Sequence, residues 1–224
     1  GNEVGEWMSH DKRIPLLSAT GSTRMGKAVA TAVAARLGRS LLELGGNNAI
    51  IITKDADLDI AIRAAVFGAV GTAGQRCTTT RRLIVQEEVY ETVKQKLIAA
   101  YRQLRIGNPL DENNHVGPLI DQEAAKHYLD AIESCKKEGG TFIVEGGTLT
   151  GKEYESGCYV KPCIAEAQPA YKIVQQETFS PILYLLKFKT IEEAIQIQND
   201  VPQGLSSSII TRNLSEAELF LSAA

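Results

Sequence analysis

The sequence has no long apolar run, no basic excess and few residues that could bind a metal. Its longest apolar runs, such as residues 49–52, are far shorter than the roughly 20 residues of a membrane-spanning helix, so we expect no membrane segment. Lysine and arginine total 24 against 27 aspartate and glutamate, a net charge of −3, and we therefore expect no nucleic-acid partner. Four cysteines without a Cys-x-x-Cys pair and three histidines give no zinc-ligand spacing, so we expect no metal site.

Two further absences concern the compartment and the ends of the chain. The first residues include neither the basic nor the apolar region of a signal peptide, and the cysteines are scattered. We therefore expect a reduced compartment, cytoplasmic or mitochondrial, and no secretion. The first strand-helix unit begins almost at residue 1 and the last helix stops without a cap, so we expect a piece of a longer protein.

What the sequence does contain is a regular alternation of apolar stretches of strand length with amphipathic stretches of helix length. Hydrophobic residues at 44% and charged residues at 23% are typical of globular proteins. Because strands and helices alternate, the sequence predicts an α/β fold with a mainly parallel sheet and flanking helices. We expect strands at residues 14–20, 41–46, 50–52, 83–85, 184–186 and 208–210, and helices at residues 23–37, 58–70, 89–104, 122–138, 191–198 and 215–224.

An acidic residue within an apolar strand is the first chemical anomaly. Glu43 is flanked by leucines, so we expect it to be at least partly buried, and burial raises the pKa of a carboxyl group toward the range of a general base. The alternative is a glutamate on the solvated face of the strand.

The second feature is a cysteine in a glycine-rich loop. Cys77 follows two glycines and is close in sequence to Arg76, Arg81 and Arg82, whose charge would favour a thiolate. A thiolate in such a loop could act as a nucleophile. The alternative is an inert buried thiol, which we expect for the remaining cysteines, Cys135, Cys158 and Cys163.

The third feature is a glycine turn between a strand and a helix. Gly21 and Ser22 precede a helix whose first backbone N–H groups would be unpaired, which is an arrangement that binds anions. An ordinary capped helix explains the same residues equally well.

Taken in order, three motifs resemble the signature of the NAD(P)-dependent aldehyde dehydrogenases. Further motifs extend the likeness over essentially the whole chain, and within the family the sequence is most similar to the antiquitin branch, the α-aminoadipic semialdehyde dehydrogenases. The three ordered motifs are residues 42–46, 74–78 and 176–181; the further ones are 107–109, 117–119 and 204–206; and those shared with the antiquitin branch are 1–7, 44–49, 71–79 and 204–209.

The resemblance implies roles for two catalytic residues. Cys77 matches the nucleophile that attacks the aldehyde carbon, and Glu43 matches the general base that activates water to hydrolyse the thioester. The backbone N–H of Cys77 is the candidate donor to the developing oxyanion, while the family's second donor is expected upstream of residue 1.

For the cofactor, which we expect to be NAD, the resemblance implies contacts along the chain. Residues that match the family's cofactor site are Gly21 and Ser22 for the pyrophosphate, Leu44 near the nicotinamide, Glu177 for its ribose, Phe179 beside it, and Gly5 and Glu6 in a loop near the adenosine half. The residues that decide between NAD and NADP are expected upstream.

For the substrate, a small-molecule aldehyde, the resemblance points to the neighbours of the nucleophile. Arg76 suits a substrate with an anionic tail, because a guanidinium can hold a carboxylate through two hydrogen bonds, and Thr78 would face the same pocket. The alternative is that Arg76 points to solvent and that its charge only favours the thiolate form of Cys77.

The resemblance also implies the domain organisation and the reaction. We expect residues 1–42 to be the end of a Rossmann-like cofactor domain and residues 43–224 to be an incomplete catalytic domain of aldehyde dehydrogenase-like fold. The expected reaction oxidises α-aminoadipic semialdehyde, in lysine catabolism, in a parent protein that forms a homodimer or homotetramer. Two alternatives are a cysteine hydrolase, which needs a histidine beside Cys77, and a truncated chain that keeps the fold but is catalytically incompetent.

Overall fold

The computed structural model describes residues 2–222 and divides the chain into two compact units. The first unit ends at Gly45 and the second begins at Gly46. Among the described residues, no helix has the length and the apolarity that crossing a membrane requires.

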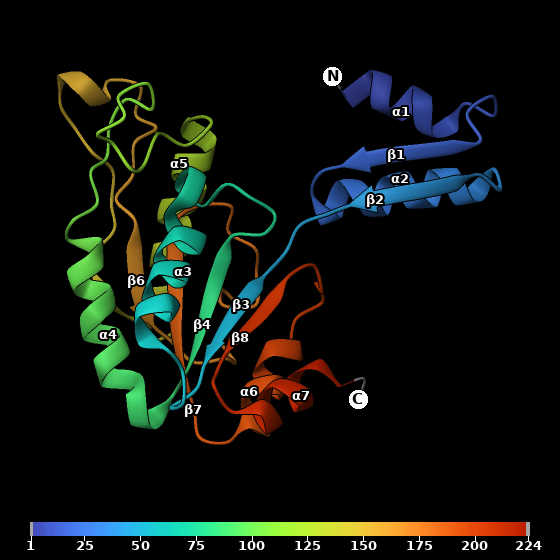
Figure 1. Cartoon of the computed structure of the whole chain (residues 1–224). Helices are drawn as coiled ribbons and strands as arrows, with labels where there is room; N and C mark the ends of the chain where they lie inside the picture. Colours follow the sequence, from blue (N-terminus) through green and yellow to red (C-terminus); the bar gives the residue numbers. More distant parts are fainter. Residues whose placement is uncertain (1, 223–224) are drawn as a thin grey trace. The chain divides into compact units, whose positions relative to one another are not determined.

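The first unit is a β-α-β unit preceded by a helix (Figure 1). Its elements are α1 (Asn2–His10), β1 (Leu16–Thr20), α2 (Thr23–Ala35) and β2 (Arg39–Glu43). The two strands are parallel, with Leu16 opposite Arg39 and Thr20 opposite Glu43. Helix α2 begins where the sequence predicted, because the Ser22 Oγ accepts a hydrogen bond from the Met25 N–H at 3.1 Å.

Helix α1 corrects the sequence analysis, which expected a loop around Gly5 and Glu6. Both residues lie inside the helix. The loop was expected from the family resemblance alone. Glycine costs a helix about 1 kcal/mol relative to alanine, and the helix forms here despite that cost. In the structure Glu3 occupies the first turn, and the Ser9 Oγ donates to the Gly5 carbonyl at 2.8 Å in the last turn.

The second unit is built on a six-stranded sheet of order β5-β6-β7-β4-β3-β8 (Figure 1). Neighbouring strands are parallel except for the antiparallel pair β5 and β6, so the predicted mainly parallel α/β sheet is confirmed. The sequence analysis missed β5 and β6, which are only four residues long and show no clear alternation. The strands are β3 (Asn48–Ile52), β4 (Thr80–Gln86), β5 (Thr141–Val144), β6 (Cys163–Glu166), β7 (Ile182–Phe188) and β8 (Ser207–Ile210).

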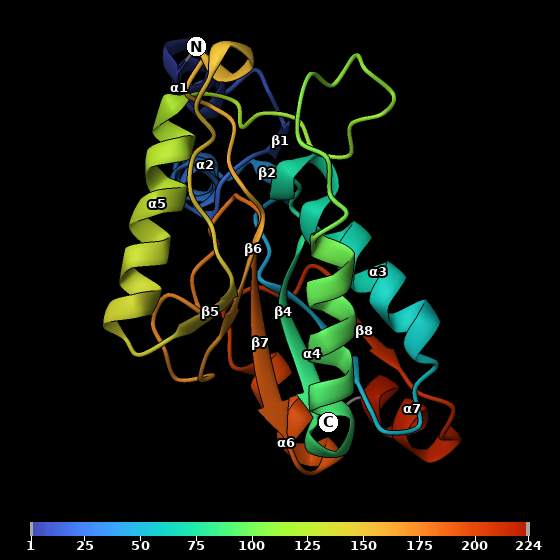
Figure 2. The ribbon, with the colours of Figure 1, turned by 90° about the vertical axis from the view of Figure 1, so that its left-hand side faces the viewer.

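Helices cover this sheet and close its core. Figure 2 shows α3 and α4 side by side; both pack on β4, whereas α6 packs on β3, β4 and β7. Small residues of α3, among them Ala61 and Ala65, are fully buried against the sheet, which lets the helix approach closely. The helices are α3 (Leu58–Val70), α4 (Glu87–Tyr101), α5 (Gln122–Lys137), α6 (Ile191–Asn199) and α7 (Leu214–Leu221), with short 3-10 turns at η1 (Gly71–Gly74) and η2 (Lys152–Tyr154).

The amino ends of three adjacent strands, β3, β4 and β7, position the site of the second unit. All three strands are parallel, so the segments that lead into them meet at one edge of the sheet. These segments carry Asn48, Cys77 and the loop of residues 176–181.

Candidate active site

Cys77 lies in a tight loop between α3 and β4. The loop passes through three consecutive residues with positive φ, Thr72 at 54°, Ala73 at 51° and Gly74 at 72°. A side chain at Gly74 would place its Cβ 2.4 Å from the backbone of Ser180, so the loop of Cys77 and the loop of Ser180 touch directly at this glycine.

Cys77 differs from the other cysteines in exposure. Its side chain is exposed, whereas Cys135 and Cys163 are buried, as the sequence predicted. Burial raises the pKa of the Cys135 thiol to about 11 and that of the Cys163 thiol to about 12. Cys158 was also expected to be buried, but it is only half-buried because it lies in the loop before β6.

Two buried side chains hold the backbone around Cys77. The Arg81 Nη2 donates to the Arg76 carbonyl at 3.0 Å, and the Asn48 Nδ2 donates to the carbonyls of Cys77 and Thr79 at 2.8 Å each. The Thr79 N–H also donates to the Arg76 carbonyl, at 3.1 Å.

The same Arg81 guanidinium reaches the loop of residues 176–181. Its Nη1 donates to the Thr178 carbonyl at 2.7 Å, and its Nη2 lies 3.4 Å from the Glu177 Oε1. Its Nε donates to the Gly46 carbonyl at 3.2 Å. Arg81 is 1% exposed, and burial lowers its pKa while the Glu177 carboxylate opposes that effect.

Arg82, expected beside the thiol, binds a different set of groups. Its guanidinium donates to the carbonyls of Asn47, Ile197 and Gln198, at 2.7 to 3.1 Å. Burial lowers the pKa of Arg82 to about 10. Successive residues of a strand point to opposite faces of the sheet, so only Arg81 can serve the Cys77 loop.

Glu177 and Phe179 lie together on the loop that precedes β7. The Glu177 Oε1 accepts the Gly46 N–H at 3.0 Å in addition to Arg81, while its Oε2 has no protein donor among the described residues. Phe179 is 47% exposed, and its ring centroid lies 5.4 Å from the Arg81 Cζ.

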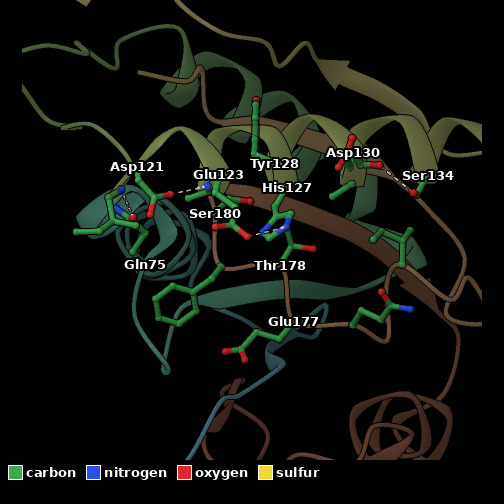
Figure 3. Close-up of a pocket in the computed structure, with 16 residues that line it drawn as sticks. Gln75, Asp121, Glu123, His127, Tyr128, Asp130, Ser134, Glu177, Thr178 and Ser180 are labelled. Carbon is green, nitrogen blue, oxygen red and sulfur yellow. Dashed lines mark hydrogen bonds and ion pairs between the residues drawn. The ribbon is translucent and has the colours of Figure 1, made fainter. Parts of the chain in front are cut away.

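This loop forms one wall of a cavity of about 520 Å³, and helix α5 forms the other (Figure 3). On α5, the His127 Nε2 lies 3.9 Å from the Glu123 Oε1. The sequence analysis missed these two residues as part of the cavity wall, although their spacing of four on a helix was a signal that both share one face. Within the second unit, neither His115 nor His127 is hydrogen-bonded to Cys77, which weighs against the cysteine hydrolase.

A second cavity, of about 570 Å³, is lined by Arg76, Phe67, Leu104 and His115 among others, and Cys77 itself lines neither this cavity nor the first. The Arg76 Nε donates to the Thr72 Oγ1 at 2.8 Å, and its Cζ lies 5.4 Å from the centroid of the Phe67 ring. The two terminal nitrogens of Arg76 have no acceptor among the described residues. Thr78 is exposed but lines neither of these two cavities.

The first unit holds a cavity of about 670 Å³ between α1, β1 and α2, lined by Gly5, Glu6, Ser22 and Met25 among others. Gly21 adjoins it, and its N–H donates to the Glu43 carbonyl at 3.0 Å across the carboxyl ends of β1 and β2. Leu44 packs on α2 at Gly26, where a Cβ would lie 2.4 Å from the leucine side chain.

Glu43 is exposed, so partial burial was wrong and the alternative that the sequence left open, a glutamate on the solvated face of the strand, is confirmed. The neighbouring leucines did not indicate a buried face, because the sheet of the first unit has only two strands and Leu41 is itself exposed. Glu43 belongs to the first unit and Cys77 to the second, and their convergence stays a prediction.

The whole chain, residues 1–224, matches the model of the aldehyde dehydrogenase family. Aldehyde dehydrogenase family 7 member B4 of Arabidopsis thaliana is 49% identical over 95% of this chain and 41% of its own length. Alpha-aminoadipic semialdehyde dehydrogenase of Bos taurus is 50% identical over 96% of this chain and 39% of its own length.

Solved structures agree with the sequence comparison. Betaine aldehyde dehydrogenase of Staphylococcus aureus, crystallised with NAD⁺, superposes with a TM-score of 0.92 at 31% identity, over 96% of this chain and 43% of that chain. The chain thus spans about two fifths of the length of the relatives that it matches. Because the family model matches every residue of the chain and the fold is shared, the chain belongs to the aldehyde dehydrogenase family.

Proposed function

We propose that this chain supplies the nucleophile, the water-activating base and much of the cofactor site of an NAD-dependent aldehyde dehydrogenase. The observation that carries the proposal is the exposed thiol of Cys77, on a loop that Arg81 ties to the loop of Glu177, a carboxylate that keeps one oxygen free. A thiol exposed at the end of a rigid loop can meet a small substrate without a rearrangement of the backbone.

The proposed chemistry begins at the Cys77 sulfur. The thiolate forms a C–S bond with the aldehyde carbon, and the carbonyl electron pair moves to the oxygen, where the Cys77 N–H stabilises it. NAD, when bound, supplies the acceptor for the hydride that the resulting thiohemiacetal loses, which leaves a thioester on Cys77. Glu43 then takes a proton from water, the hydroxide adds to the thioester carbon, and the C–S bond breaks to release the acid and the thiolate.

Two features of the chain fit NAD. The free Glu177 Oε2 is an acceptor for a ribose hydroxyl, and the exposed Phe179 ring offers an apolar face beside it. In the first unit, the N-terminus of α2 at Ser22 opens on a cavity of about 670 Å³, and unpaired N–H groups at a helix N-terminus favour a phosphate group. The Staphylococcus aureus relative crystallised with NAD⁺ supports the same choice.

We further propose a semialdehyde that carries a carboxylate, namely α-aminoadipic semialdehyde of lysine breakdown, as the substrate. Arg76 lies in the wall of the second cavity with both terminal nitrogens free, so its guanidinium can hold a carboxylate through two hydrogen bonds. Thr78 is the exposed neighbour on the other side of the thiol. The name of the Bos taurus relative supports this substrate. As in the antiquitin branch that it resembles, we propose that the parent enzyme is a homodimer or homotetramer of the cytoplasm or mitochondrion.

The test is an aldehyde-dependent assay of NADH absorbance on a full-length enzyme that contains this chain. Wild-type protein is expected to form NADH from the semialdehyde, and Cys77→Ala is expected to form none. The buried Cys135→Ala serves as the matched control and keeps the activity of each folded molecule. NADH formation by Cys77→Ala at the wild-type rate would refute the assignment.

A second candidate function follows from the length of the chain. Because the chain spans about two fifths of its relatives, the 224-residue protein could keep this fold and yet not turn over. The same assay on the 224-residue chain alone decides between the two, since an incompetent chain forms no NADH with any aldehyde.

A further inference from the structure

We propose that Arg81 and Asn48 are positioning residues that fix the two peptide groups flanking Cys77, and that Arg81 thereby aims the Cys77 N–H at the oxygen of the bound aldehyde. This inference rests on the proposed function and gives a positioning role to two residues, Arg81 and Asn48, to which the resemblance assigns none. We call the pair the peptide clamp.

The first half of the clamp acts on the peptide group between Arg76 and Cys77. A trans peptide is planar, so the Cys77 N–H points opposite to the Arg76 carbonyl. That carbonyl is anchored by two donors, the Arg81 Nη2 at 3.0 Å and the Thr79 N–H at 3.1 Å. The Cys77 N–H must therefore point away from Arg81, and it donates to no acceptor among the described residues. It is a free donor of fixed direction, which is what an oxyanion needs.

The second half acts on the peptide group between Cys77 and Thr78. The Cys77 carbonyl accepts the Asn48 Nδ2 at 2.8 Å, and the same nitrogen donates to the Thr79 carbonyl at 2.8 Å. Asn48 is 4% exposed and is the first residue of β3. With the peptide planes before and after Cys77 both held, φ and ψ of the nucleophile are fixed.

Gly46 shows how closely the clamp is packed. A Cβ at Gly46 would lie 2.5 Å from the Cys77 carbonyl oxygen and 2.6 Å from the Asn48 Oδ1. The carbonyl of Gly46 accepts from the Arg81 Nε, and its N–H donates to the Glu177 Oε1. This one residue therefore touches both members of the clamp and the carboxylate of the proposed cofactor site.

The guanidinium shape is essential to the clamp. One planar group binds the Arg76 carbonyl, the Thr178 carbonyl and the Glu177 Oε1, so it aligns the thiol loop with the Glu177 loop. The ammonium group of a lysine has only one nitrogen, so it could not hold these acceptors in the same plane. The Arg81 guanidinium is buried, and since its nearest carboxylate oxygen lies at 3.4 Å, its donors are satisfied mainly by backbone carbonyls.

The experiment separates two reactions of the same thiol. Iodoacetamide forms a C–S bond at a saturated carbon and releases iodide, so no oxyanion develops. Hydrolysis of p-nitrophenyl acetate passes through an acyl-thiol and does develop an oxyanion, yet it uses no NAD. In a full-length enzyme that contains this chain, we would measure the high-pH plateau of Cys77 alkylation and the kcat of ester hydrolysis.

Arg81→Gln is expected to lower the ester kcat by about 10²-fold, the loss seen when an oxyanion donor is removed, while the alkylation plateau changes by less than about threefold. Arg82→Gln is the matched control, because it removes a buried guanidinium that holds three carbonyls outside the Cys77 loop. Its ratio of ester kcat to alkylation plateau is expected to equal that of the wild type.

An unchanged ratio in Arg81→Gln, or an equal fall of both rates, would overturn the clamp. Should Arg81→Gln not fold, Arg81→Lys keeps the charge without the planar fork and is expected to lower the ratio at least tenfold. Failure of the proposed function is distinguishable, since it shows as a wild-type enzyme that forms no NADH, and the ester-to-alkylation ratio does not depend on NADH.

Discussion

A methyl group at Gly74 is expected to disrupt the contact between the Cys77 loop and the Ser180 loop. The backbone of Gly74 has φ of 72°, which costs a non-glycine residue about 1 to 2 kcal/mol. The added Cβ would also lie 2.4 Å from the Ser180 carbonyl carbon and oxygen, and relief of such overpacking costs about 1 to 3 kcal/mol. Gly74→Ala is therefore expected to lower the free energy of unfolding by about 2 to 5 kcal/mol.

Urea unfolding measures this loss, and two other glycines serve as controls. Gly151 has φ of 128° with no atom within 4 Å of an added Cβ, so Gly151→Ala reports strain without overlap. Gly204 has neither a positive φ nor a close neighbour, so Gly204→Ala should change stability by less than about 0.5 kcal/mol. A Gly74→Ala protein as stable as Gly204→Ala would refute the reasoning.

Three other predictions concern the substrate, the cofactor and the thiols. Arg76→Ala in a full-length enzyme should raise KM roughly 10- to 100-fold for a carboxylate-bearing semialdehyde, the value of a charge-assisted hydrogen bond, and much less for an alkyl aldehyde; equal effects in steady-state kinetics would remove the anchoring role. The 224-residue chain alone should bind NAD poorly and self-associate, because it exposes large apolar side chains such as Leu37 and Leu110, and a micromolar Kd by calorimetry would contradict this. At pH 8, brief iodoacetamide treatment should alkylate Cys77 and spare Cys135 and Cys163, whose pKa values are raised by burial to about 11 and about 12; peptide mapping that finds all three labelled at one rate would show that burial does not protect them.

The sequence predicted the elements whose periodicity is strong. Helix α3 spans the predicted residues 58–70, and α5 begins at the predicted Gln122, because an N-cap aspartate precedes each of them. Strands β5 and β6 are four residues long, as is β8. The sequence predicted β8 because it completes a strand-helix-strand unit with β7 and α6, whereas β5 and β6 have no such neighbours in the chain. Helix α1 was missed because the segment of Gly5 and Glu6 was assigned from the family resemblance, which implied a loop, whereas the backbone there is helical.

The candidate site could be predicted only in part. The motifs give the types of residue in the site, but they do not give the contacts that these residues make in the fold. The motifs identified Cys77 and Glu177, but nothing local distinguishes Arg81 from Arg82. What separates them is the direction of each side chain from β4, and Arg81 finds its partners in Thr178 and Glu177, more than ninety positions away in the chain. The sequence left the exposure of Glu43 open for the same reason, because burial depends on how many strands a sheet has.

Placement at the amino edge of the large sheet has a consequence for motion. Cys77, Asn48 and Ser180 each lie within three residues of a strand whose side chains are almost all buried. A movement of the backbone at any of these residues would break hydrogen bonds between the central strands of the sheet. Central strands are the last part of a domain to open in local unfolding. Because the backbone of the site is already ordered, binding a ligand here loses little conformational entropy of the protein. Adaptation to different ligands must come from exposed side chains such as Arg76 and Phe179.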